Sequence, residues 1–218
     1  MKKVLLIAVG LVLGAGAFAQ EGESAGNKMW IGGTVGFGSS NNADGNDNTN
    51  DVKTSGWEFG PTFGFMLNDK MAVGINLMVD GKTTTKNNKD ADETKVSGYN
   101  FEPFFRYYFA GTGNFKFYGD ATVNFGGGKT TWSDNTGSDP VDSKYSKFGV
   151  GLHPGVQYWF TDDWSMASTI GLVGFSQMST KRNVINDKGN KVEVTDKVSD
   201  FGLIGDFSSL KFSFFYHF

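Results

Sequence analysis

Large apolar side chains alternate with small or polar ones along most of this chain. The last ten residues show the pattern most plainly, because their apolar members stand at every second position: Leu210, Phe212, Phe214, Tyr216 and Phe218. A period of two with one apolar face predicts a β-strand. An aromatic-faced edge strand at the end of a water-soluble protein would promote aggregation. It is favourable where the apolar face contacts lipid and all strand edges are paired in a closed barrel.

The same alternation recurs upstream and predicts eight strands. We expect them at 29–39, 54–67, 71–81, 97–109, 115–128, 145–160, 164–177 and 209–218. Residues 200–206 are more apolar than a free loop, so we expect them to extend the eighth strand, with a bend near 206–208.

The predicted connections alternate in length, which is independent support for a barrel. Short turns are expected at 68–70, 110–114 and 161–163, and long polar loops at 40–53, 82–96, 129–144 and 178–207. Outer-membrane barrels combine short periplasmic turns with long extracellular loops. The sequence therefore predicts an all-β fold, an eight-stranded antiparallel up-and-down transmembrane barrel.

The first 19 residues have the features of a secretory signal peptide. Lys2 and Lys3 precede an apolar run, and Ala17-Phe18-Ala19 offers a small-residue cleavage site. The run is too short to span a bilayer. We expect a signal peptide at 1–19, a short periplasmic lead-in at 20–28 and one barrel domain at 29–218.

The amino-acid composition excludes several kinds of chemical site. The chain has 21 Phe, 31 Gly and no Cys, and its formal net charge is −3. Without cysteine there is no disulfide, thiolate metal site or lipid-anchoring residue. An acidic chain with no basic stripe gives no indication of nucleic-acid binding, and we expect no cofactor.

The charged residues within the strands fall mostly on the face without aromatics. The candidates are Glu58, Glu102, Arg106, Lys116, Asp120 and Lys211. Because charges are costly in lipid, this face is expected to line the lumen. A hairpin centred near Thr112 would place Arg106 opposite Tyr118 and diagonal to Asp120. The group is either a satisfied ion-pair core or a gate whose pairs rearrange to pass small solutes.

The sequence also offers acidic residues for a metal site and two histidines for catalysis. Asp44, Asp47 and Asp51 could approach a Ca²⁺ ion, but their spacing lacks a glycine turn and a closing bidentate Glu, so no metal site is predicted. His153 and His217 are the two histidines, and neither has Ser and Asp at a motif-like spacing. We therefore expect no catalytic residues and no enzyme activity.

The aromatic ending, the Gly/aromatic strands, the loop alternation and the signal peptide resemble the OmpA-like eight-stranded outer-membrane β-barrel superfamily of Gram-negative bacteria. The resemblance covers roughly 29–218 and is greatest to small stand-alone barrels of the porin family, without a peptidoglycan-binding domain. It implies a monomer in outer-membrane lipid, delivered by periplasmic chaperones and inserted by the barrel-assembly machinery. It also implies that Phe214, Tyr216 and Phe218 form the assembly signal.

Three classes of function remain open from the sequence. The first is a structural or surface-interaction barrel with a lumen largely filled by side chains, since eight strands leave little interior space. The second is a small porin-like or OmpW-like channel for small or hydrophobic solutes. The third is a soluble exported barrel of lipocalin type, in which the apolar faces would point inward and the protein would need no detergent.

Overall fold

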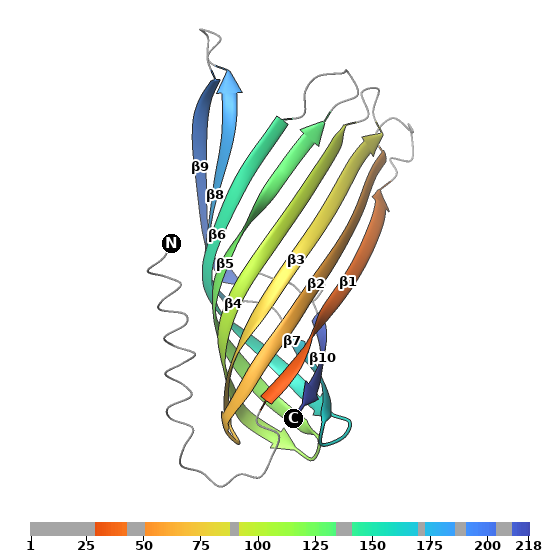
Figure 1. The fold of residues 1–218 in the computed structure, drawn as a ribbon, viewed down its shortest axis with the longest axis vertical. Coiled ribbons are helices and arrows are strands. Elements are labelled where there is room, and N and C mark those ends of the chain that lie inside the picture. The colour runs from red at the N-terminus through yellow and green to blue at the C-terminus, as the bar shows by residue number, and fades with distance from the viewer. Residues whose placement is uncertain are drawn as a thin grey trace.

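The computed structural model describes residues 29–42, 51–87, 92–133, 141–169, 173–185, 191–203 and 211–218. They form a tilted antiparallel β-barrel (Figure 1). No helix within these ranges is long and apolar enough to cross a membrane. The predicted signal peptide and lead-in lie outside the described residues.

The barrel contains ten strand segments that occupy eight positions in its wall. The segments are β1 (Met29–Asn42), β2 (Asp51–Asn68), β3 (Met71–Asn87), β4 (Glu93–Thr112), β5 (Phe115–Ser133), β6 (Val141–Trp159), β7 (Trp164–Thr169), β8 (Val173–Ile185), β9 (Lys191–Leu203) and β10 (Lys211–His217). Both β7 and β8 pair with β6, while β10 pairs with β7 and β9 with β8. The last four segments are therefore the two halves of the seventh and eighth strands, and the predicted fold class is confirmed.

The predicted strands end too early on the side of the long connections. The loop predicted at 178–207 is wrong, because β8 and β9 form a paired hairpin over most of it. Most of the predicted loop at 82–96 is also strand, since β3 continues to Asn87 and β4 begins at Glu93. These extra residues are rich in Lys and Thr, and those at 82–87, 93–96, 178–185 and 191–199 contain no aromatic side chain, so they lack the strong alternation that marks a strand inside a membrane.

Pairing between β1 and β10 closes the barrel. Trp30 to Gly33 pair with His217 to Phe214, which joins the first strand to the last. Beyond Gly33, β1 pairs with β2 alone, and β9 pairs with β8 alone in the part of the chain that the structure describes. In Figure 1 the β8–β9 hairpin rises at the left and β1 stands at the right. The upper half of the wall thus has two strand edges with no described partner.

Local side chains explain the short turns at the other end, here called the turn end. The amide oxygen of Asn68 accepts hydrogen bonds from the backbone N–H groups of Lys70 and Met71, both at 2.9 Å. Gly113 has φ 55°, which favours glycine in the two-residue turn between β4 and β5. The hydroxyl of Thr161 accepts from the N–H groups of Asp163 and Trp164.

The outer face of the barrel is apolar, as the alternation predicts. Exposed large side chains on it come from every part of the wall and include Phe59, Leu77, Phe105, Leu152, Phe201 and Phe214. A broad apolar surface of this kind is stable only against lipid or a partner.

The interior of the turn-end half is packed with aromatic rings. This set, here called the plug, consists of Trp30, Phe104, Tyr108, Tyr118, Trp159 and Phe215. All but Trp159 are almost fully buried. A Cβ added at Gly64 would collide with the Trp30 ring, and one at Gly155 with the Tyr118 ring. Inward glycines therefore make the space that the plug fills.

Candidate functional site

A chain of polar contacts crosses the plug and links five strands. Asp120 on β5 binds Arg106 on β4, and Arg106 donates to Gln157 on β6 at 3.1 Å. Gln157 donates from Nε2 to the hydroxyl of Ser165 on β7 at 2.7 Å. Ser165 Oγ and His217 Nε2 on β10 are also 2.7 Å apart. We call these five residues the crossing network.

Arg106 and Asp120 are the charged pair of this network. The Arg106 Nε and Nη2 groups donate to the two carboxylate oxygens of Asp120, each at 2.8 Å. Both side chains are nearly fully buried, at 5% and 8% exposure. The guanidinium also lies 3.7 Å from the ring centroid of Tyr118. Bidentate geometry and a stacked ring are the favourable arrangement for a desolvated arginine.

The predicted register of this hairpin is wrong by two residues on β5, because the turn lies at Gly113 and Asn114 rather than at Thr112. Arg106 lies directly opposite Asp120, and Tyr118 lies opposite Tyr108. The pairing shifts between Tyr108 and Ala110, where a bulge adds one residue to β4. A bulge cannot be read from alternation alone, because the apolar pattern continues through it.

The other predicted lumen charges do not join this pair. Glu102 accepts hydrogen bonds from Asn76 at 3.0 Å and Asn124 at 3.4 Å. The ammonium of Lys116 lies 4.9 Å from the ring centroid of Trp159. Lys211 begins β10, but its side chain lies outside the described residues. Of the six predicted charges, those with described side chains therefore occupy several separate environments.

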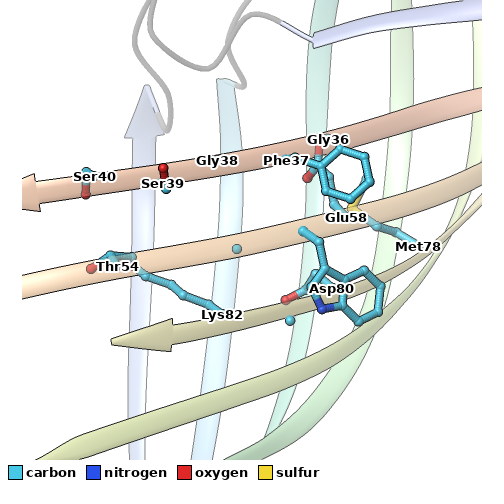
Figure 2. A pocket seen from close by; sticks show the side chains of 13 residues that line it. Gly36, Phe37, Gly38, Ser39, Ser40, Thr54, Glu58, Met78, Asp80 and Lys82 are labelled. Carbon is cyan, nitrogen blue, oxygen red and sulfur yellow. The ribbon is translucent and has the colours of Figure 1, made fainter. Parts of the chain in front are cut away.

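Glu58 lies further toward the loop end, on the inner wall of β1 to β3. A pocket of about 590 Å³ is lined there by residues that include Glu58, Asp80 and Lys82 (Figure 2). Glu58 and Asp80 are directly opposite each other on β2 and β3. The prediction that Asp44, Asp47 and Asp51 form no calcium site is not tested, since Asp44, Asp47 and the Asp51 side chain lie outside the described residues.

A second cavity, of about 460 Å³, lies on the loop-end side of the crossing network. Most of its lining residues are polar or charged, among them Asn76, Asn100, Glu102, Asn124, Lys147 and His153. Arg106 and Asp120 also line it, so the buried pair forms its floor. The Nε2 atom of His153 is buried and has no hydrogen-bond partner among the described residues. This cavity is the site at which a small solute would meet the plug.

Sequence reasoning missed the neutral members of the crossing network. Gln157 and Ser165 are almost fully buried, and Gln157 also accepts a hydrogen bond from the Tyr108 hydroxyl at 2.7 Å. Both stand at inward positions of their strands, which is the one signal the sequence gives. No group of His, Asp or Glu within the described residues is arranged to hold a metal ion.

Comparison with known proteins agrees with this architecture. Residues 5–218 match the family model described as the outer membrane protein beta-barrel domain. The chain belongs to that family. It is therefore an outer-membrane β-barrel protein. No curated protein matches the chain.

Solved outer-membrane barrels are similar in fold. The outer membrane protein OprG from Pseudomonas aeruginosa has 18% sequence identity and a TM-score of 0.51, with 88% of this chain and 98% of OprG covered. A major outer membrane protein from Thermus thermophilus has 12% identity and a TM-score of 0.47, covering 87% and 99%. The translocator domain of the autotransporter NalP from Neisseria meningitidis has 12% identity and a TM-score of 0.44, covering 98% and 97%.

Membership of this family gives the barrel its orientation. Short turns of outer-membrane barrels face the periplasm and longer connections face the exterior. We therefore expect the plug and the crossing network to lie in the periplasmic half, and the polar cavity to lie in the extracellular half. Exposed rings near the short turns, among them Phe109, Phe115, Phe160, Trp164 and Phe218, form the periplasmic aromatic girdle.

Proposed function

We propose that this protein is a non-catalytic structural or surface-interaction barrel that is closed at its periplasmic end. The observation that carries the proposal is the buried Arg106–Asp120 pair inside the plug. An ion crossing the lumen would have to separate this pair and displace the rings of Tyr108 and Tyr118, which pack edge to face at 5.9 Å. Separating the pair is costly because it leaves buried charge without a partner, and moving the rings disrupts a packed interior.

Conductance of the refolded protein in a planar bilayer tests this proposal. We expect a folded barrel, recognised by its shifted migration on an unheated gel, to remain electrically silent. Arg106→Ala and Asp120→Ala are the matched variants, because each removes one member of the ion pair that forms the floor of the cavity. Reproducible discrete steps in the wild-type protein, altered by either substitution, would contradict the structural role and establish a channel.

A second candidate function is the passage of small or hydrophobic solutes, and the cavity above the floor favours it. The cavity occupies about 460 Å³, and its lining includes Thr34, the first residue of β1 beyond the pairing with β10; no pairing of β1 with β9 is described beyond that point. A solute could then enter from the exterior and leave sideways into the membrane without crossing the plug.

Filling the cavity tests this passage without touching its floor. Asn100 lines the cavity, whereas Val79 on the neighbouring strand is an exposed side chain of the outer face. We expect Asn100→Trp to lower solute uptake into barrel-containing vesicles several-fold if the passage exists, and Val79→Trp to leave uptake unchanged. Equal uptake by the wild-type protein and both variants would reject the passage.

We also propose that the final aromatic residues direct assembly, as expected from the sequence. Phe218 exchanges two backbone hydrogen bonds with Met29, at 3.0 and 2.8 Å, and its ring stacks on Tyr216. Removing Phe218 should lower the amount of barrel in the outer membrane while leaving export intact, as measured by cell fractionation.

Two substitutions distinguish a C-terminal assembly signal from a general effect of removing an exposed aromatic side chain. Phe218→Ala keeps the backbone bonds to Met29, and Phe160→Ala removes a girdle ring of similar exposure, 50% against 52%. We expect the first substitution to impair assembly and the second to have little effect. Equal assembly of both variants would count against a signal at the C-terminus.

A further inference from the structure

Lysines occupy outward-facing positions just beyond the apolar band on six strand segments. This set, here called the lysine belt, consists of Lys53, Lys95, Lys129, Lys144, Lys181 and Lys197. Strand alternation places each on the same face as the exposed aromatics of its own strand. All six are at least partly exposed, and none lines the lumen cavity.

The spacing between this belt and the aromatic residues is regular. On β2, β4, β5, β6 and β9 the lysine stands four residues from the last outward aromatic toward the loop end; these aromatics are Trp57, Tyr99, Phe125, Phe148 and Phe201. Four residues of strand tilted as in such barrels rise about 10 Å along the membrane normal. Since aromatic rings mark the interface, the lysines lie at the depth of the lipid headgroups.

Three members of the belt are direct neighbours across adjacent strands. Lys129 on β5 pairs with Lys144 on β6, and Lys144 pairs with Lys181 on β8. Like charges placed directly opposite one another destabilise a sheet unless counter-charges are present. The row is therefore a concentrated positive site on the outside of the barrel.

Carboxylates neutralise only part of this row. Asp142 binds Lys129 at 2.9 Å and Glu193 binds Lys181 at 2.7 Å. The hydrogen bond from Lys129, followed by that from Thr131, holds the pKa of Asp142 below its usual value. Lys144, between the two bridged lysines, has no ion pair within the described residues. An excess of positive charge therefore remains at the centre of the row.

The belt does not follow from a basic composition. The whole chain has a formal net charge of −3. Lysines at the same height also face the lumen: Lys82 and Lys147 line the two cavities, and Lys86 follows Lys82 on the same face of β3. The outward set differs because it lies at headgroup depth, where an anion would be a lipid phosphate.

We propose that the lysine belt, centred on Lys129, Lys144 and Lys181, is a docking surface for the phosphate groups of anionic lipid in the outer leaflet. Ammonium groups bind phosphate as mobile point charges, and their apolar stems lie along the outer wall. The phosphates supply the counter-charge that the row lacks. The surface fixes the height of the barrel in the membrane and surrounds it with phosphate-bearing lipid.

Retention of lipid A by the full chain, measured by native mass spectrometry from a neutral detergent, tests the proposal. The variant is Lys129→Gln/Lys144→Gln/Lys181→Gln. The matched control is Lys82→Gln/Lys86→Gln/Lys147→Gln, which removes the same charge from the lumen face. We expect the belt variant to lose at least about tenfold in apparent affinity for diphosphorylated lipid A, because three cations that attract the lipid phosphates are removed. The lumen variant should lose less than about twofold by the same reasoning.

Three results would overturn the proposal. The first is equal loss in both triple variants, which would reflect net charge alone. The second is equal retention of dephosphorylated lipid A by the wild-type protein, which would assign binding to the acyl chains. The third is full displacement by millimolar inorganic phosphate, which would assign the site to free anions. Shifted gel migration of both unheated variants establishes that they are folded.

Discussion

Replacing Arg106 with alanine is expected to destabilise the barrel by about 3–5 kcal/mol, because the substitution leaves the Asp120 carboxylate buried without its partner. Asp120 is 8% exposed, and both of its oxygens accept hydrogen bonds from the guanidinium. The Gln157 side chain would also lose a charged donor. Equilibrium unfolding in urea from lipid vesicles, followed by tryptophan fluorescence, measures the change in the free energy of unfolding.

Two further variants show whether the loss comes from the unpaired charge. Arg106→Leu combined with Asp120→Leu removes both charges and should cost less than Arg106→Ala, since no buried ion remains. Lys116→Ala removes a lumen cation that contacts only aromatic rings among the described residues, and should cost little. If the double variant were as unstable as Arg106→Ala, the pair would be acting through packing rather than charge.

Placing arginine at Leu152 is expected to destabilise the inserted barrel by about 2–4 kcal/mol. Leu152 faces outward with 60% exposure, midway along the outward side chains of β6, and its cross-strand partner Ala121 is also exposed. A charged side chain there must be stabilised by lipid headgroups or water drawn toward the membrane centre. The same unfolding measurement in vesicles of defined thickness gives the magnitude.

Asn124→Arg is the matched control for this experiment. Asn124 lies on the adjoining strand β5 but lines the lumen cavity, close to Glu102. We expect arginine there to cost less, because it meets polar side chains and a carboxylate. If Leu152→Arg and Asn124→Arg had equal effects, the assignment of the two faces to lipid and lumen would be wrong.

The sequence predicted correctly those features that follow from the alternation of apolar and polar residues, namely the strands inside the membrane and their two faces. A period of two identified the faces of the strands, so it placed Arg106 and Asp120 inward and Leu152 outward. It failed beyond the apolar band, since residues 178–185 and 191–199 are rich in polar side chains and contain no aromatic residue, so they look like a loop. Hydrogen-bonded pairing continues there without an apolar pattern to reveal it.

The contacts within the lumen depended on information that alternation does not carry. The turn between β4 and β5 lies at Gly113 and Asn114 rather than at Thr112, and the extra residue near Phe109 moves the pairing back by one position, so Arg106 faces Asp120 and not Tyr118. Gln157 and Ser165 have neutral side chains, so nothing in their chemistry distinguished them from other small or polar inward residues. Their role follows only from the register of β6 against β7, which places them diagonally across the two strands, within hydrogen-bonding distance.

The closure between β1 and β10 has a consequence for how the protein folds. Thr34 and Ser213, whose hydroxyls are 2.6 Å apart, are separated by 179 positions in the chain. Contacts of such long range form late, because nearly the whole polypeptide must be ordered before they yield any stabilisation. Trp30 and His217 meet across the same closure at 5.9 Å. The plug residues Trp30 and Phe215 therefore pack only after the last strand has paired with the first. Before that step the aromatic side chains of the chain remain exposed, and the chain must be protected from aggregation.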